Sequence, residues 1–350
     1  MASSYVCPGC GAAMEFDSES QKMKCSHCGT TLTVEELDTL NEYSKKQEDE
    51  VVGEFNYDDE KESFVKYKCP SCGAELLTDE NTVATFCSFC GTPTLVESRV
   101  EDELKPSHLI PFKIKKDEAK KKFLSWAKKG LFTPSDFYSS STVDKITGMY
   151  VPFWLYNYNA ETNISCKAER VHHEVRGDYE YVHTDHYMVT RDVEADFNRI
   201  PADAAENMPD DVMDKLEPFE YRDLTEFQKP YLSGYYAEKY GYSADDMSER
   251  IEKRVKDFIY EAARSTIHGY DSVTVVNRSN RLKRNKAEYV LMPVWLLNYR
   301  YKGKEYMFTL NGQTGRIVAD RPFSNAKRLG WFAGMTVVLT IIIRIIGIFI

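Results

Sequence analysis

The 350-residue sequence lacks the short motifs that mark several common catalytic sites. It contains no GxxxxGK phosphate-binding loop, no GxSxG nucleophile motif and no HExxH metalloprotease motif. No cysteine–histidine pair stands out as a nucleophile and its base. Because NTPases, hydrolases and proteases commonly use these motifs, their absence weakens all three classes. The sequence therefore predicts a protein that is not an enzyme.

Positive charge is also scarce. The chain has 45 Lys and Arg against 55 Asp and Glu, a net charge of −10. Residues 1–100 hold 8 basic and 19 acidic residues, so their balance is 8 − 19 = −11. The acidic balance of residues 1–100 is unfavourable for contact with phosphates, so the sequence predicts that nucleic acid is not a partner. Residues 34–66 contain much of the acid and read as a solvated linker or helix.

The N-terminus lacks the apolar region of a signal peptide, whereas the other end is strongly apolar. Leu329–Ile350 has 22 residues, and at about 1.5 Å per residue a helix of this length crosses a bilayer core. Its thirteen Leu, Ile, Val and Phe residues favour insertion by about −4 to −8 kcal/mol, more than the about +3 kcal/mol that Arg344 costs at most. A buried core helix, the alternative, would need an apolar enclosure on all sides. We expect residues 329–350 to form a transmembrane helix.

Charges next to this segment predict its orientation. Arg321, Lys327 and Arg328 precede it, which favours a single-pass protein of the cell membrane with most of the chain in the cytoplasm. Two interpretations of Arg344 stay open. Its side chain reaches the far headgroups, or it pairs with an acidic group in a partner's membrane helix. Gly330 and Gly334 form a GxxxG motif that would seat such a helix.

Cysteine gives the strongest pattern. Eight of the nine cysteines form four CxxC pairs, and the second set of two pairs repeats the first 62 residues later. Four thiolates in such pairs suit tetrahedral zinc, and the glycine after each second cysteine permits a tight turn. We expect two zinc ions, both structural because four protein ligands leave no position for a catalytic water. The predicted ligands, in ribbons at residues 1–33 and 67–98, are Cys7, Cys10, Cys25, Cys28, Cys69, Cys72, Cys87 and Cys90.

Residues 104–323 predict an α+β, β-rich central domain. HLIPFKI indicates a short strand, and a helix with Ala119, Phe123, Trp126 and Ala127 on one face follows it. The segment Pro152–Tyr158 recurs as Pro293–Tyr299 with Pro, Trp, Leu, Asn and Tyr at the same places, which predicts two equivalent buried strands. LNGQTGR predicts a hairpin turn after the second copy.

Between the two copies, a turn at Gly177–Asp178 predicts a hairpin. A capping box at Ser243 and Asp246 predicts a helix with Met247, Ile251, Val255, Phe258, Ile259 and Ala262 facing inward. The basic run RSNRLKRNK predicts an exposed loop, or otherwise a contact with an acidic partner or lipid. Four histidines, His172, His173, His183 and His186, crowd the hairpin; they read as surface residues or as a transition-metal site, and no carboxylate placement decides between these.

The order of these parts resembles the YdjG-type bacterial zinc-ribbon membrane proteins. The resemblance rests on two CPxCG ribbons, HLIPFKI, YVPFWLYNY, PVWLLNYRY, LNGQTGR and the terminal apolar segment. It implies a setting in membrane-stress systems, beside PspA-like and flotillin-like proteins that such proteins recruit to the membrane. The family has no catalytic residues to carry over, and only the eight cysteines transfer.

The sequence thus predicts a multidomain protein with two small zinc ribbons, a β-rich domain with an internal strand repeat and a C-terminal transmembrane helix. The expected function is that of a membrane-anchored adaptor that recruits or scaffolds cytosolic proteins. The alternative is a membrane-tethered nucleic-acid-binding protein, because zinc ribbons often contact nucleic acid. The acidic balance of residues 1–100 favours the adaptor.

Overall fold

Two strands, β10 (Thr147–Arg176) and β15 (Glu288–Tyr301), carry the chain between the two units into which it divides. The computed structural model describes residues 2–3, 5–40, 64–68, 75–79, 82–86, 92–96, 105–206 and 208–349. Unit 1 and unit 2 are defined here by their residues. Unit 1 comprises Met1–Pro152, Asn207–Lys239 and Leu291–Ile350, and unit 2 comprises Phe153–Glu206 and Tyr240–Val290. The domain boundaries expected from the sequence stay predictions.

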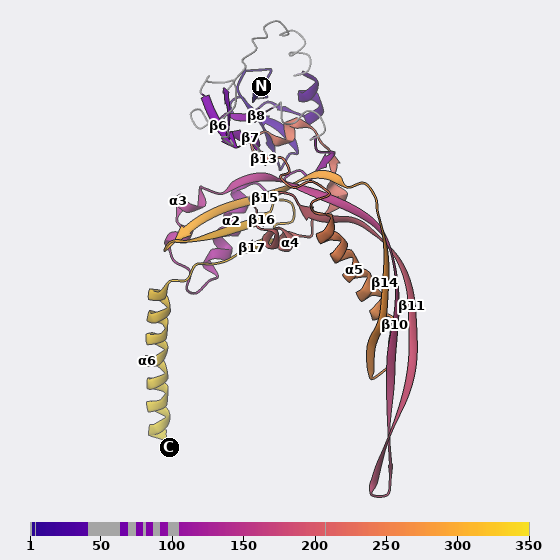
Figure 1. The fold of residues 1–350 in the computed structure, drawn as a ribbon. Helices are drawn as coiled ribbons and strands as arrows, with labels where there is room; N and C mark the ends of the chain where they lie inside the picture. Colours follow the sequence, from indigo (N-terminus) through magenta and orange to yellow (C-terminus); the bar gives the residue numbers. More distant parts are fainter. Residues whose placement is uncertain are drawn as a thin grey trace. The chain divides into compact units, whose positions relative to one another are not determined.

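The β-rich character expected of the chain is confirmed. The main sheet has the strand order β1-β8-β7-β13-β10-β15-β16-β17 (Figure 1). Its shorter strands are β1 (Ala2–Ser3), β7 (Thr82–Phe86), β8 (Pro93–Val96), β13 (Tyr236–Glu238), β16 (Lys304–Asn311) and β17 (Ile317–Ala319). A separate sheet consists of β2 (Met14–Asp17), β3 (Lys22–Cys25) and β4 (Thr31–Leu32). Cys7 and Cys10 precede β2, whereas Cys25 ends β3 and Cys28 lies between β3 and β4. A third sheet pairs β5 (Phe64–Lys68) with β6 (Glu75–Asp79), and β9 (His108–Leu109) pairs with β12 (Thr225–Glu226).

Besides α6, which is described below, three short helices of unit 1 lie between residues 116 and 216. They are α2 (Lys116–Lys128), α3 (Ser140–Val143) and α4 (Asp210–Leu216), with 3-10 turns at Asp136–Tyr138, Tyr221–Asp223 and Lys229–Leu232. The predicted inner face of α2 is confirmed for Ala119, Phe123 and Ala127, which are buried. Phe123 packs edge-on against Phe308 of β16, with ring centroids 4.9 Å apart. The spacing of apolar residues therefore placed this helix correctly on its sheet.

An aromatic cluster forms the centre of unit 1. Phe112 stacks on Tyr235 with ring centroids 4.0 Å apart and also contacts Trp295 edge-on at 5.2 Å. The Trp295 indole donates a hydrogen bond to the carbonyl oxygen of Ile114 at 2.9 Å, so its only polar group is satisfied inside the core. The segment after β9 is thereby fixed against the second copy of the sequence repeat.

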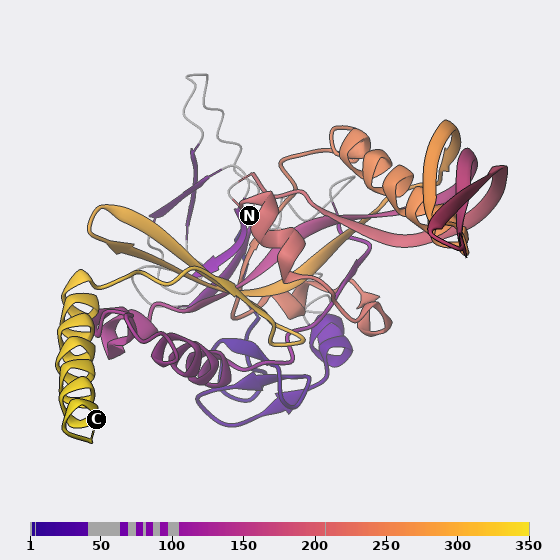
Figure 2. The same cartoon turned by 90° about the horizontal axis from the view of Figure 1, so that it is seen from below.

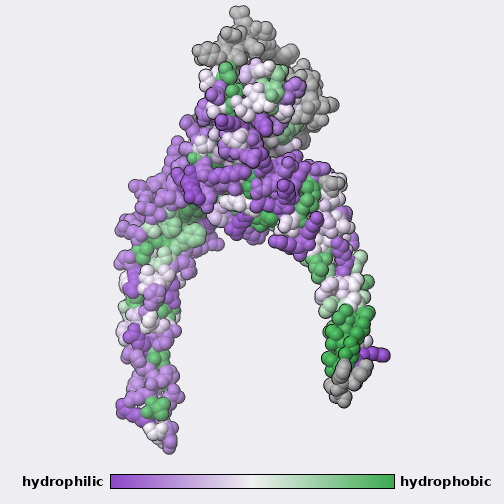
Figure 3. Space-filling model, turned by 180° about the vertical axis from the view of Figure 1, so that it is seen from behind, coloured by the Kyte–Doolittle hydropathy of each residue, from purple (hydrophilic) through white to green (hydrophobic). Residues whose placement is uncertain are grey.

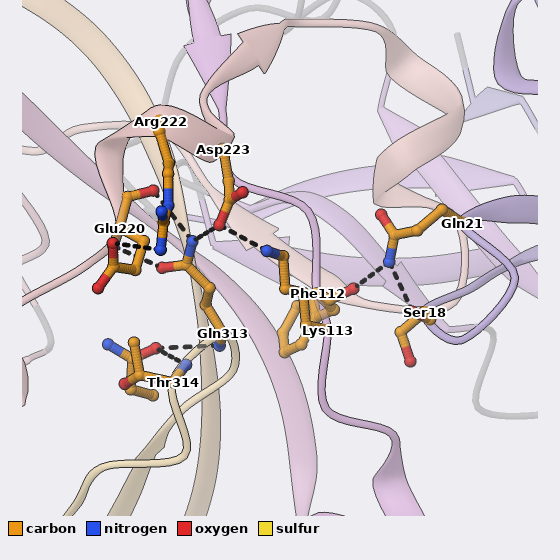
Figure 4. A network of polar contacts seen from close by, with 10 residues as sticks. Ser18, Gln21, Phe112, Lys113, Glu220, Arg222, Asp223, Gln313 and Thr314 are labelled. Atoms are coloured by element: carbon orange, nitrogen blue, oxygen red, sulfur yellow. Dashed lines mark hydrogen bonds and ion pairs between the residues drawn. The ribbon is translucent and has the colours of Figure 1, made fainter.

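The turn that LNGQTGR predicted lies between β16 and β17, and side-chain hydrogen bonds hold it. The Asn311 carboxamide oxygen accepts from two backbone N–H groups of the turn, both at 2.9 Å. Gln313 accepts from the backbone N–H of Glu220 at 2.8 Å and donates to its carbonyl at 3.0 Å (Figure 4). Gln313 also donates to Asp223, which accepts from Lys113 at 2.6 Å. The Lys113 ammonium group lowers the pKa of Asp223, so this pair stabilises the fold at neutral pH and weakens as the carboxylate is protonated.

Unit 2 is a twisted antiparallel sheet covered by one helix. The central strand β10 pairs with β11 (Tyr179–Asp203) on one side and with β14 (Ser272–Arg284) on the other. The helix α5 (Ser248–Ser265) runs along one face of these strands (Figures 1 and 2). The predicted hairpin is confirmed, and Gly177 adopts a φ of 64° in its two-residue turn, a conformation that favours glycine.

The predicted capping box forms, but it closes a turn at 244–247, and α5 begins only at Ser248, with no side-chain cap. The predicted inner face of the helix is also partly wrong. Ser243 and Asp246 exchange hydrogen bonds as a capping box, with the Ser243 N–H 2.8 Å from the Asp246 carboxylate. The buried residues of the helix follow a strict four-residue spacing: Ile251, Val255, Ile259 and Ala263. Phe258 is 47% exposed and Ala262 is exposed as well. The helix therefore contacts the sheet through one row of side chains, narrower than the face that the sequence predicted.

The basic run RSNRLKRNK is not a loop, and this prediction was wrong. Most of it forms the end of β14, and its arginines have partners within unit 2. Arg278 lies over the Tyr260 ring at 4.5 Å, Arg281 lies 3.7 Å from a Glu161 carboxylate oxygen, and Arg284 binds Asp245 at 2.7 Å. Backbone pairing with β10, which is distant in the sequence, thus makes a strand of an apparently solvated run, and its arginines find acidic and aromatic partners on the surface.

The C-terminal apolar segment forms the helix α6 (Asn325–Phe349). Asn325–Ile346 is long and apolar enough to cross a membrane, and none of it is buried inside the protein. Its surface is mostly apolar in Figure 3. Unit 1 holds its start by polar contacts, including Lys327 Nζ to the Thr133 carbonyl at 2.7 Å and the Ser324 N–H to the Phe132 carbonyl at 2.8 Å.

We expect Ile259→Ala to destabilise the protein by about 2 to 5 kcal/mol, because it leaves a cavity between α5 and the sheet of unit 2. Phe258→Ala, one position away, should cost much less because that side chain is largely exposed. Urea unfolding in detergent, followed by circular dichroism, compares the two. Equal costs for both variants would contradict the observed orientation of α5.

Candidate metal centre

Two turns of the same geometry bring four cysteines together at the start of unit 1. In the first, the Gly11 N–H donates to the Cys7 carbonyl at 2.8 Å; in the second, the Gly29 N–H donates to the Cys25 carbonyl at 3.0 Å. Gly11 and Gly29 have φ angles of 73° and 79°, which L side chains rarely adopt. The predicted role of the glycine after each second cysteine is therefore confirmed for these two turns.

The sulfur positions fit a tetrahedral metal ion. The ligand atoms of Cys7, Cys10, Cys25 and Cys28 all lie within 4.8 Å of one another. Cys7 and Cys28 sulfurs are 3.5 Å apart, and Cys10 and Cys25 sulfurs are 3.6 Å apart. A tetrahedral zinc ion with bonds of about 2.3 Å places its sulfur ligands roughly 3.8 Å apart. Of the residues that the structure describes, this is the one group of three or more such ligands that converges to this degree.

The electrostatics of the cluster also favour a cation. The hydroxyl and the backbone N–H of Thr30 lower the pKa of Cys28 to about 6, and the Thr30 Oγ1 lies 3.0 Å from its sulfur. The backbone N–H of Ala12 lowers the pKa of Cys10, but the other three sulfurs and burial raise it to about 12. One thiolate therefore forms easily while full ionisation is opposed by mutual repulsion. A divalent ion removes that repulsion and binds all four thiolates.

Thr30 is a functional residue that the sequence reasoning missed. It follows the second CxxCG turn directly, where a hydroxyl can reach the last sulfur, so its position in CSHCGT was the available signal. His27, inside the same turn, is exposed and does not belong to the sulfur cluster, as expected. Cys166 is fully buried in the apolar core of unit 2, also as expected.

The first ribbon is docked on the rest of unit 1. The Phe16 N–H donates to the Ser233 carbonyl at 3.0 Å, and the Ser233 hydroxyl donates back to the Met14 carbonyl at 2.7 Å. Gln21 donates to the carbonyl of Phe112 at 2.9 Å, and the Phe16 ring lies 5.0 Å from that of Tyr231. These contacts link the metal-binding turns to the aromatic cluster of the unit.

The other four predicted ligands, Cys69, Cys72, Cys87 and Cys90, lie outside the described residues. The strands near them repeat those of the first ribbon. Shifting β2, β3 and β4 by 62 residues, the offset between Cys7 and Cys69, gives 76–79, 84–87 and 93–94. The strands β6, β7 and β8 overlap these three ranges. The internal repeat thus extends to the positions of the strands but not to their pairing, because β2, β3 and β4 form one sheet whereas β6 pairs with β5 and β7 pairs with β8.

Comparison with known proteins places the chain in a family. No family model and no solved structure matches it. Over 335 residues it is 39% identical to a Bacillus subtilis (strain 168) protein named "Uncharacterized protein YdjG". The aligned residues cover 96% of this chain and 94% of the relative. The chain belongs to the YdjG family. The family resemblance predicted from the ribbons and the strand repeat is therefore confirmed, and the match to YdjG extends over nearly the whole chain.

We expect Cys25→Ala to lower the metal content of the protein by roughly one equivalent, because three remaining thiolates hold the ion much less tightly. Cys166→Ala removes a buried thiol that has no part in the cluster and should leave the metal content unchanged. Mass-spectrometric metal analysis of both purified variants makes the comparison. Unchanged metal in Cys25→Ala would show that these four sulfurs do not hold an ion.

Proposed function

We propose that this YdjG-family chain is a membrane-anchored zinc-ribbon adaptor. Its ribbons would hold two zinc ions and present a rigid surface to cytosolic partner proteins, and α6 would fix it in the cell membrane as a single-pass anchor. The bulk of the chain would then lie in the cytoplasm. The proposed setting is a membrane-stress response, with PspA-like and flotillin-like proteins as the partners that it recruits or scaffolds.

The observation that carries the proposal is a closed four-sulfur site in the same unit as an unburied apolar helix. A metal with four protein ligands has no open position for a substrate or water, so the site supports structure and binding instead of catalysis. An apolar helix with none of its surface inside the protein needs another apolar environment. A membrane supplies it.

The residues around the start of α6 favour the proposed orientation. Arg321 donates to the Trp126 carbonyl at 3.2 Å and lies over that indole at 4.5 Å, while Lys327 contacts Thr133. Basic residues flanking a span favour the cytoplasmic side. Trp331 lies one turn further along, beside Phe132 with ring centroids 6.0 Å apart, and tryptophan is frequent at membrane interfaces.

Removing residues 325–350 should move the protein from the membrane to the soluble fraction with its metal content intact. Full-length protein should carry about two zinc ions and should retain PspA-like or flotillin-like proteins on affinity purification from detergent-solubilised membranes. The shortened chain should no longer bring these partners to the membrane. Cell fractionation, metal analysis and co-purification test these three expectations in one set of samples.

Arg344→Leu is the matched variant for the anchor. If the Arg344 side chain reaches the headgroups, the variant inserts as well as the wild type and recovers the same partners. If it pairs with an acidic group in another membrane helix, insertion persists but partner recovery falls.

A shortened chain that stays in the membrane fraction without its partners would rule out a single anchor. Tight DNA binding at physiological salt would instead favour the nucleic-acid alternative.

A further inference from the structure

The end of the β10–β11 hairpin is only two strands wide among the residues that the structure describes. The ladder between β14 and β10 ends at Ser272 and Glu169, and α5 ends at Ser265. Beyond these points the hairpin continues to its turn at Gly177. A two-stranded ribbon without a third strand or a helix is marginally stable in water. Figure 3 shows a largely hydrophilic surface on this hairpin.

The strand register resolves the arrangement of the four histidines in this segment. His172 lies directly opposite His183, whereas His173 faces Val182 and His186 faces Glu169. Side chains alternate between the two faces of a strand, so His172 and His183 share one face. Their Cβ atoms are therefore about 5 Å apart. His173 and His186 lie on the other face, four residues out of register and roughly 13 Å apart along the strand.

Two carboxylates flank the His172–His183 pair on the same face. The His172 Nε2 lies 3.4 Å from an Asp185 carboxylate oxygen, and the His183 Nε2 lies 3.9 Å from a Glu174 carboxylate oxygen. Each imidazole thus directs the same nitrogen toward an acidic oxygen. On the opposite face, His173 contacts Glu180 at 2.8 Å and His186 contacts Glu169 at 3.3 Å, as two separate pairs.

We propose that His172, His183, Asp185 and Glu174 form a binding site for a divalent transition-metal ion such as Zn²⁺. Two imidazoles and two carboxylates make a four-ligand set that suits this ion. The ligand atoms do not yet converge, but the four side chains are 47% to 62% exposed, so rotation about side-chain bonds can bring them together. Glu174 also accepts from Arg176 at 2.8 Å, which makes Asp185 the stronger of the two carboxylate ligands.

An ion at this position would join the two strands beyond the point where, among the described residues, β14 pairs with them. It would fix the register of the hairpin end and reduce its local opening, since a ligand that binds only the ordered form stabilises that form. The site is independent of the cysteine cluster, because it lies in unit 2 and uses nitrogen and oxygen ligands.

The test is calorimetric titration of ZnCl₂ into untagged full-length protein whose cysteine sites have first been saturated with zinc and the excess removed. We expect about one further ion per chain in the wild type, and a loss of affinity by more than tenfold, roughly, in the double variant His172→Ala/His183→Ala. The matched control is His173→Ala/His186→Ala, which removes two histidines from the same hairpin but from the other face. It should bind as the wild type does.

A second pair of variants tests the carboxylates. Asp185→Asn should weaken zinc binding, whereas Glu180→Gln, which also neutralises an exposed acid beside a histidine, should not. Addition of zinc should slow hydrogen exchange of the amides in residues 171–186 in the wild type. It should not do so in His172→Ala/His183→Ala, which lacks the histidine pair. No further ion in the wild type, or equal losses in the two double variants, would overturn the proposal.

Discussion

Mutual repulsion among four thiolates within 4.8 Å of one another is the constraint on which the first ribbon depends. The ribbon is too small to bury a large core, so a cation that neutralised these sulfurs would supply much of its folding free energy. Its sheet is also joined to the rest of unit 1 through Ser233 and through Gln21, which donates to Phe112. Phe112 in turn stacks on Tyr235 at the centre of the unit. Metal binding would therefore be coupled to the packing of unit 1, because the ribbon does not form a separate domain.

The sequence repeat gains a meaning from the division into two units. Each copy lies where the chain passes from one unit to the other. The first copy starts at the boundary after Pro152, and the second starts three residues after Val290, at Pro293. The two tryptophans anchor different units, since Trp154 donates to the Tyr242 carbonyl and Trp295 to that of Ile114, both at 2.9 Å. The repeat thus specifies the two strands that pass between the units, each with an indole that donates one hydrogen bond to a backbone carbonyl.

Features with a local cause were predicted from the sequence, and those with a distant cause were not. The cysteine turns, the Gly177 turn and the capping box at Ser243 each depend on neighbours within a few residues, so their patterns were sufficient. The strand formed by most of RSNRLKRNK depends on its pairing with β10, which is far away in the sequence. The docking of the first ribbon on Ser233 likewise has no local signal. Long-range partners decide such elements, and a single sequence does not display them.

The two kinds of metal-ligand set differ in how far the fold arranges them in advance. Tight backbone turns fix the four sulfurs, and two of the four cysteines, Cys7 and Cys25, are buried, so an ion held there would exchange slowly and would serve structure. The hairpin ligands are exposed side chains on two strands, and only their register is fixed. That register follows from the turn, because a two-residue loop at Gly177–Asp178 pairs Arg176 with Tyr179 and hence His172 with His183. Binding at the proposed hairpin site would lower the conformational entropy of these side chains, which weakens the affinity. Its occupancy would therefore respond to the free metal concentration.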